Sequence, residues 1–486
     1  MNIAHYLLAT AMKRSATSTG LYQFGDNPAT TPEMFLSKIA GRVEQLSGSV
    51  TEGEMVLVAS GRDFDFFIDL FALWTLGAIA IPYSPADGPE YLQQIRQISG
   101  ADYCLNGHLS TPKTYSHLTI EDINFTDREP ELPCAVLFTS GSTGTPKGVL
   151  LSQYSLLNNA IATLSITRLE KERLFVNVPF HFTSAICHFL SACLSESTFL
   201  GSETRLIFSD FVQQFVSLQA TGIGGAPVQL RWLAEASGAN ADYLKSSLNF
   251  AFSSGDHLAV EISEKLRTNY PKCQLFTVYG LTELGGRFCI LRPEETTCHA
   301  GSVGRPIPGL TVEVVDANSG EPKHAGDEGI IVAAGELVAS GYLNNPVETS
   351  EAFRRGNLYT GDLGYIDING YVFVTGREND VFKVNGKKVS AQKISSALML
   401  SDYFSDAAVI SFHIPIFGTV PIACCVITEG KEFKRGEVLK LLRETLPNNH
   451  IPHDFVMLEE IPRTGSGKVK RAELKTLVEQ RLNYAI

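Results

Sequence analysis

The amino-acid sequence predicts an α/β fold with largely parallel sheets, divided into a large N-terminal domain and a small C-terminal α+β domain. Apolar segments of strand length alternate with helical segments over roughly the first 280 residues, which is typical of parallel α/β sheets. After Ala300, dense Gly and Pro separate short strand-like segments and predict a β-rich subdomain. From Ala391 a compact helix-and-strand pattern of about 100 residues follows, a common domain size.

The elements are expected in the following order. Thr31 and Pro32 predict a helix start, because a hydroxyl can cap the first turn and proline is tolerated there. Helices are expected at 34–46, 64–76, 91–99, 212–221 and 259–268, and strands at 56–59, 78–82, 135–138, 174–178, 250–252 and 274–278. Strands at 311–315 and 329–332 belong to the β-rich subdomain, at about 300–378. The large domain is predicted at 1–378 and the small domain at 379–486.

Composition narrows the functional class. A chain of 486 residues with 44% hydrophobic content can bury large cores, and its net charge of −12 argues against nucleic acid as a partner. Nine cysteines without a Cys-x-x-Cys pair favour reduced, mostly buried thiols in a cytoplasmic protein. The longest apolar stretch, 66–83, contains Asp69 and Pro82 and indicates a buried helix followed by a strand rather than a membrane span.

A loop rich in glycine and hydroxyl groups is the most informative segment of the chain. It follows an apolar run at 135–138, and Lys147 closes it. Glycines let backbone N–H groups approach a ligand, hydroxyls add donors, and the lysine adds a positive charge, which together suit a polyphosphate. The spacing is not that of the usual nucleotide P-loop, because Pro146 precedes the lysine and Gly148 follows it. The loop residues are Thr139, Ser140, Gly141, Ser142, Thr143, Gly144 and Lys147.

Other polar segments complete a nucleotide-binding pattern. Tyr279, Gly280, Thr282 and Glu283 come after an apolar strand, where α/β sheets place their ligands. Tyr279 offers a flat face for adenine, Thr282 a hydroxyl for the α-phosphate, and Glu283 a carboxylate for Mg²⁺. Asp362 follows Thr360 and Gly361, and its carboxylate can accept hydrogen bonds from two hydroxyls. Taken alone, the segment at 277–283 and the segment at Asp362 could each be an ordinary turn without a functional role.

Together these segments resemble the signature motifs of the adenylate-forming superfamily, which contains acyl-CoA synthetases, adenylation domains and luciferases. The resemblance runs from about Thr31 to Arg471, with five motifs in the family's order. It implies that the glycine-rich loop holds the β- and γ-phosphates of ATP. It also implies that Asp362 accepts from both ribose hydroxyls and that Arg377 contacts the ribose or phosphate. It implies that Lys468 is the catalytic cation between the carboxylate and the α-phosphate. Asn379 stands at the family's hinge, about which the small domain is expected to rotate. Further nucleotide-binding residues by similarity are Ser254, Gly255, Asp256, Val278 and Lys383.

The acyl pocket is assigned by the same resemblance. His181 is the candidate gate and catalytic residue, with a packed histidine as the alternative. No Asp or Glu lies between Val178 and Ala192, which disfavours an α-amino acid, because a buried ammonium without a partner costs several kcal/mol. Arg287 either binds a second carboxylate of the substrate or faces phosphate or solvent. The pocket residues by similarity are Phe182, Thr183, Gly225, Phe252, Ser254, Gly286 and Arg287.

The implied reaction is the ATP-dependent conversion of an acyl or aryl acid to an acyl-adenylate, followed by transfer to a thiol. The thiol is either coenzyme A or the phosphopantetheine of a carrier protein supplied in trans, and Mg²⁺ accompanies ATP. Two alternatives remain at this stage. One is an amino-acid adenylation enzyme that loads a separate carrier protein, and the other is a non-catalytic nucleotide-binding homologue. Intact Lys147, Glu283, Asp362, Arg377 and Lys468 argue against the second.

Overall fold

The structure is a computed structural model that describes residues 2–13, 20–25, 27–61, 65–105, 118–140, 145–202, 208–384, 387–414, 417–463 and 469–481. Two compact units make up the chain. The first comprises Met1–Val312 and Val332–Tyr359, and the second comprises Glu313–Ile331 and Thr360–Ile486. The chain changes unit within three strands, β14 (Leu310–Val315), β15 (Gly329–Gly335) and β17 (Asn357–Ile366). The predicted domain boundary at 378–379 stays a prediction.

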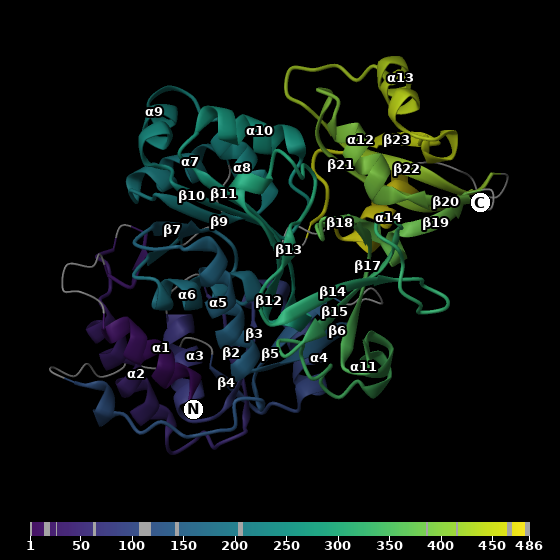
Figure 1. The fold of residues 1–486 in the computed structure, drawn as a ribbon. Helices are drawn as coiled ribbons and strands as arrows, with labels where there is room; N and C mark the ends of the chain where they lie inside the picture. The colour runs from purple at the N-terminus through teal and green to yellow at the C-terminus, as the bar shows by residue number, and fades with distance from the viewer. Residues whose placement is uncertain are drawn as a thin grey trace. The chain divides into compact units, whose positions relative to one another are not determined.

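Two sheets of mainly parallel strands build the first unit, as predicted (Figure 1). Parallel pairing holds along each sheet up to one edge, where a hairpin reverses the chain. The five-stranded sheet has the order β4 (Tyr103–Leu105), β2 (Met55–Ala59), β3 (Ile79–Tyr83), β5 (Pro133–Ser140), β6 (Pro146–Ser152). The eight-stranded sheet has the order β1 (Tyr22–Phe24), β8 (Thr198–Gly201), β7 (Arg173–Val176), β9 (Gly222–Gly225), β10 (Phe250–Ser254), β11 (Gln274–Leu281), β12 (Gly286–Leu291), β13 (Arg305–Pro306).

Helices cover these sheets. The predicted helix start at Thr31 is confirmed, because its side chain accepts a hydrogen bond from the backbone N–H of Met34 and Pro32 occupies the first turn. The long apolar stretch is also confirmed as a buried helix and strand, with Asp69 held by Arg42 at 3.2 Å. The helices of this unit are α1 (Ile3–Met12), α2 (Pro32–Leu46), α3 (Asp65–Thr75), α4 (Pro89–Ser99), α5 (Gln153–Thr167), α6 (Thr183–Leu194), α7 (Phe208–Ser217), α8 (Pro227–Ala234), α9 (Gly238–Ser247), α10 (Val260–Asn269) and α11 (Pro346–Ala352).

Some element predictions were wrong. The helix expected at 212–221 is α7, which ends at Ser217 because Gln219 turns the chain with a φ of 51°. The helices of the first unit that were not predicted are α1, α5, α6, α8, α9 and α11. Helix α6 buries nearly its whole surface, so it has no polar face and its sequence lacks the amphipathic period from which a helix is recognised. This burial matters for function, because α6 packs against β12, the strand that carries Gly286 and Arg287.

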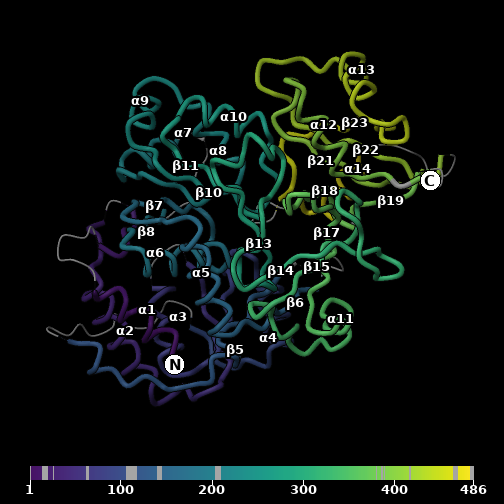
Figure 2. Tube along the Cα trace, viewed as in Figure 1, coloured from purple at the N-terminus to yellow at the C-terminus, as the bar shows by residue number. Residues whose placement is uncertain are grey.

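The second unit has a three-stranded sheet and helices packed on it, consistent with a small α+β domain (Figure 2). Its two core clusters contain the apolar residues of the two sides of this sheet, among them the adjacent Cys424 and Cys425. All nine cysteines are free thiols, and six of them are buried, as predicted. The remaining elements are β16 (Phe353–Arg354), β18 (Val372–Arg377), β19 (Val381–Val384), β20 (Lys387–Ser390), α12 (Ala391–Met399), β21 (Phe404–Ile414), β22 (Gly418–Ile427), α13 (Arg435–Thr445), β23 (Asp454–Met457) and α14 (Arg471–Arg481), of which β16 belongs to the first unit.

Candidate active site

The hairpin β5–β6 carries the predicted phosphate loop at its turn. The antiparallel register places Thr139 opposite Lys147, and the Thr139 hydroxyl donates to the Lys147 carbonyl oxygen at 3.5 Å. The loop therefore starts at the carboxyl end of a strand that pairs in parallel with β3. Both ends of the loop are held by the strand ladder. Residues Gly141, Ser142, Thr143 and Gly144 and the side chain of Ser140 lie outside the described residues.

The hairpin β11–β12 carries the second predicted motif. Tyr279 and Gly280 lie within β11, so the expectation that they follow the strand is wrong, whereas Thr282 and Glu283 do follow it, in the 3-10 turn η3 (Thr282–Leu284). The ladder shifts register between Tyr279 and Gly280. A Cβ on Gly280 would lie 2.3 Å from the carbonyl oxygen of Gly286, so only glycine fits this bulge.

One chain segment, 339–343, joins the two hairpins. The backbone N–H of Ala339 donates to the carbonyl oxygen of Glu283 at 2.8 Å, and that of Leu343 donates to the carbonyl oxygen of Gly148 at 2.7 Å. Figures 1 and 2 show β6 beside α11, which follows this segment. The end of the phosphate loop at Lys147 and the turn at Thr282, 135 positions apart in the sequence, are therefore joined through one segment.

Polar side chains also connect the two hairpins. Tyr342 donates its hydroxyl to Oε1 of Glu283 at 2.9 Å. Lys147 Nζ lies 5.6 Å from the centroid of the Tyr342 ring and forms an ion pair with Oε2 of Glu348 in α11. Burial, with the neighbouring Glu283 carboxylate, raises the pKa of Tyr342 well above its usual value. The tyrosine hydroxyl therefore stays protonated and keeps donating to Glu283.

Glu283 fits the predicted role of magnesium ligand. The carboxylate is half-buried, and Tyr342 donates to one of its oxygens. Mg²⁺ in phosphate sites is usually bound by one or two carboxylates together with substrate oxygens and water, rather than by a protein cage. In the part of the chain that the structure describes, no group of three or more His, Cys, Asp or Glu side chains could hold a metal ion. The donor set therefore suits a metal that arrives with a polyphosphate.

Close packing of α5 and α6 against η3 shapes the adjoining part of the site. The hydroxyls of Thr183, at the start of α6, and Thr282 lie 3.0 Å apart. The amide of Asn159 in α5 donates to the carbonyl oxygens of Leu284 and Arg287 at 2.9 and 2.7 Å. A Cβ on Gly286, whose φ is 132°, would lie 2.5 Å from Sγ of Cys187 in α6. Only glycine at position 286 therefore lets α6 pack this closely against β12.

Arg287 is buried, so the expectation that it could face solvent is wrong. Its side chain is 4% exposed, and its Nη2 lies 3.1 Å from Nδ1 of His188 in α6. Its guanidinium carbon is 5.9 Å from the centroid of the Phe252 ring in β10. Burial lowers the pKa of Arg287 to about 9 and that of His188 to about 4, so at neutral pH the arginine is charged and the histidine is neutral.

The other predicted residues of the first unit lie mostly at the ends of parallel strands. Gly225 and Ser254 end β9 and β10, with Gly255 and Asp256 exposed beyond, while Phe252 and Val278 are buried in β10 and β11. His181 and Phe182 lie in the turn before α6, with their ring centroids 4.2 Å apart. These positions share the carboxyl ends of the strands, where α/β sheets bind ligands. Which of them contact a ligand stays a prediction.

In the second unit, Asp362 and Arg377 face each other across β17 and β18. Nε of Arg377 lies 2.8 Å from Oδ1 of Asp362, which is 2% exposed. The backbone N–H of Asp362 donates to the Thr360 hydroxyl, which itself donates to the carbonyl oxygen of Ile331. The motif therefore lies inside a strand, and not in the turn that is the usual reading of a lone Thr-Gly-Asp. The Arg377 side chain is half exposed, whereas that of Asp362 is buried.

The predicted catalytic Lys468 lies outside the described residues, but the ends of its loop are described. Arg463 and Val469 form an isolated antiparallel bridge across residues 464–468. Arg463 is held by Asp406 through bonds of 2.7 and 3.1 Å, and Arg471 by Asp380 at 2.7 Å. Asn379 belongs to the 3-10 turn η5 (Glu378–Asp380), and its side chain is not among those that the structure describes. Lys383 is exposed in β19.

Four contributors to this site were not predicted. Tyr342 and Glu348 lie in a segment without a motif of its own, and Asn159 and His188 lie on helices that were not recognised from the sequence. For His188 the signal in the sequence is a histidine within a mostly apolar segment, whereas Asn159 is one of several polar residues in α5 and does not stand out.

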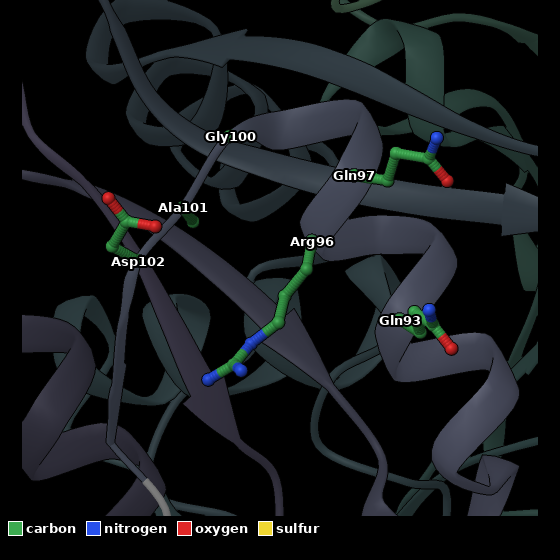
Figure 3. A pocket seen from close by; sticks show the side chains of 6 residues that line it. All are labelled: Gln93, Arg96, Gln97, Gly100, Ala101 and Asp102. Carbon is green, nitrogen blue, oxygen red and sulfur yellow. The ribbon is translucent and has the colours of Figure 1, made fainter.

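A pocket of about 410 Å³ lies away from these residues, at the C-terminal end of α4. Figure 3 shows Arg96 and Asp102 beside it, with Gln93 and Gln97 on the helix. It contains none of the predicted site residues, and its lining is polar and open. We assign it no role.

Comparison with known proteins identifies the class. The family model of AMP-binding enzymes matches residues 38–343, and the model of the AMP-binding enzyme C-terminal domain matches residues 393–468. The chain therefore belongs to the AMP-binding enzyme family. It is an ATP-dependent, AMP-forming ligase that joins a carboxylic acid to a thiol.

Individual relatives agree with this assignment. The chain is 27% identical to an indoleacetate–CoA ligase of Aromatoleum aromaticum, over 93% of this chain and 94% of that protein. It is 25% identical to a 2-succinylbenzoate–CoA ligase of Listeria innocua, over 90% of this chain and 92% of that protein. Its fold matches the o-succinylbenzoate coenzyme A synthetase of Bacillus subtilis solved with ATP and magnesium, at a TM-score of 0.81 and 20% identity over 97% of this chain and 99% of that one. Among the described residues, no helix is long and apolar enough to cross a membrane.

Proposed function

We propose that this ligase activates an acyl or aryl acid and transfers it to coenzyme A. The observation that carries the proposal is the joining of the two hairpins by Tyr342, which aligns Lys147 and Glu283 on one edge. A cation and a metal-binding carboxylate held together suit a polyphosphate, because both neutralise its charge. Coenzyme A is supported by relatives over nearly the full length of the chain that are named as CoA ligases.

In this proposal, Lys147 and the glycine-rich loop hold the leaving pyrophosphate. Glu283, oriented by Tyr342, would hold Mg²⁺, which supplies charge neutralisation at the phosphates. Thr282 would donate to the α-phosphate, with its hydroxyl oriented by the contact with Thr183. Asp362 and Arg377 would bind the ribose, and Lys468 would approach the reacting carboxylate and α-phosphate. Asn379 would be the hinge between the adenylation and thiol-transfer steps.

The acid would lack an α-ammonium group. The charged side chain within the candidate pocket is the arginine at position 287, whose guanidinium is buried. An ammonium placed beside a buried guanidinium would be repelled, because like charges at low dielectric destabilise each other. This observation disfavours the amino-acid alternative.

A carrier protein as the acceptor remains the competing hypothesis, and its phosphopantetheine thiol would present the same chemistry.

The proposal is tested by separating the two half-reactions. Carboxylate-dependent exchange of pyrophosphate into ATP reports adenylation, and thioester formation with coenzyme A or with a phosphopantetheinylated carrier protein reports the acceptor. Lys468→Ala should lower exchange by about 100-fold or more, because it removes a charge that acts in the transition state, while ATP binding persists. Exchange at the wild-type rate in this variant would refute the role of Lys468. Thioester formation with the carrier protein alone would refute coenzyme A as the acceptor.

A further inference from the structure

Arg287 is a buried cation without an anionic partner. None of the described carboxylates forms an ion pair with it, and its Nη1 has no hydrogen-bond partner among the described residues. Its Nη2 meets only Nδ1 of His188, which is 2% exposed. The buried Arg42 provides a contrast within the same unit, because it is paired with Asp69 at 3.2 Å. Burying a guanidinium without a counter-ion is costly, so its presence needs an explanation.

The side chain of Arg287 extends across the strands of the candidate pocket. It starts on β12, and its guanidinium lies near Phe252 of β10, with β11 between the two strands. His188 closes the other side of this space, packed against β9: a Cβ on Gly224 would lie 2.5 Å from Nε2 of the histidine. The lining therefore combines one cation, a neutral imidazole, an aromatic ring and glycine backbone. In the described part of the chain, no side chain of the opposite charge completes it.

The neutral histidine fixes the direction of the hydrogen bond. With His188 uncharged, Nδ1 accepts from Nη2 of Arg287, so the ring proton resides on Nε2. The imidazole thus orients the guanidinium without offsetting its positive charge. The remaining N–H groups of a guanidinium form a planar fork that matches a carboxylate.

We propose that Arg287, oriented by His188, binds a second anionic group, a carboxylate, on the tail of the acid that this enzyme activates. The inference rests on the proposed ligase function and names its substrate class as dicarboxylic acids. The acid's reacting carboxylate would be at the phosphates near Thr282, and its second carboxylate would supply the counter-ion that Arg287 lacks. Arg287 is then a specificity residue, because a tail without a charge would leave the guanidinium buried and unpaired.

The test uses three matched pairs of acids: butanoate and succinate, hexanoate and adipate, and 4-oxo-4-phenylbutanoate and 2-succinylbenzoate. In each pair the second member adds a carboxylate at the far end or on the ring. For the best pair, kcat/KM in pyrophosphate exchange should favour the dicarboxylate by about 100-fold in the wild type. Arg287→Met should abolish or reverse this preference, and Arg287→Lys, which keeps the charge, should retain part of it. A preference unchanged in Arg287→Met, or a wild-type preference for the monocarboxylates, would overturn the proposal.

A binding measurement without ATP separates this proposal from the ligase function. All three dicarboxylates are tested, and at least one should raise the Tm of the wild type and not that of Arg287→Met. If no acid supports exchange, the ligase function fails, but the Tm measurement still tests the role of Arg287. If no dicarboxylate raises the Tm of the wild type, the proposed role of Arg287 is wrong. Without ligand, Arg287→Met should be at least as stable as the wild type, because it removes an uncompensated buried charge. The control Arg42→Met should be destabilised, because it leaves Asp69 unpaired, and should keep the acid preference.

Discussion

Lys147 and Glu348, separated by 201 residues, form an ion pair in the first unit. Glu348 belongs to α11, whose first turn is capped by the side chain of Asn345. The pair lies beside the ring of Tyr342, and both side chains are mostly buried. The lysine assigned to the pyrophosphate is therefore already neutralised by a carboxylate. A polyphosphate would have to compete with Glu348 for it.

This competition predicts the effect of Glu348→Gln on ATP binding. Removing the carboxylate frees the charge of Lys147, so the KM for ATP should fall by about 3-fold, while Lys147→Met should raise it by about 10-fold or more. Initial rates of pyrophosphate exchange over a range of ATP concentrations measure both changes. If Glu348→Gln raises the KM for ATP as much as Lys147→Met does, then Glu348 positions the lysine for phosphate and does not compete with it.

The hydrogen bond from Tyr342 to Glu283 predicts a change in the metal requirement. Tyr342→Phe keeps the ring beside Lys147 and removes only the hydroxyl, so Glu283 loses a fixed orientation. The Mg²⁺ concentration that gives half-maximal exchange should rise about 10-fold, at the lower end of the range typical when a metal ligand loses its outer partner. Tyr154→Phe is the matched control, because Tyr154 donates to Glu336 at 2.6 Å at an exposed position. An equal Mg²⁺ requirement in both variants would count against the role of Tyr342.

The buried His188 predicts a loss of stability in acid. Its pKa is lowered by burial from 6.5 to about 4, so between these values the unfolded chain binds a proton that the folded chain does not. Stability therefore falls as the pH is lowered from 6.5 towards 4, by up to about 1.4 kcal/mol per pH unit for this one group. The loss should be smaller in His188→Asn than in the wild type when Tm is measured between pH 7 and pH 4.5. The variant His324→Asn, at an exposed position, should follow the wild type. A His188→Asn curve parallel to that of the wild type would show that folding does not lower the pKa of His188.

Much of the fold could be predicted from the sequence because its elements are locally encoded. Strands at 56–59 and 274–278 and the helix from Thr31 show their periods and caps in short windows, and the structure confirms them to within a few residues. Helix α6 could not be predicted, because burial on all sides removes the amphipathic period. The strand expected at 274–278 was predicted to end too early, so Tyr279 was placed after it. The strand continues through a bulge at Gly280, which no residue before that glycine indicates.

The sequence by itself determined the class of this protein, since the phosphate loop, Glu283, Asp362 and Lys468 are short motifs whose chemistry can be recognised without knowing their neighbours. Only the tertiary structure decided which side chains support them. Tyr342 reaches Glu283, Glu348 neutralises Lys147, and Arg287 is buried beside His188, all through contacts between distant segments. The physical reason is that charge pairing and desolvation depend on distance and burial in space. A residue's type gives its charge, and only its surroundings in the fold show whether that charge has a partner.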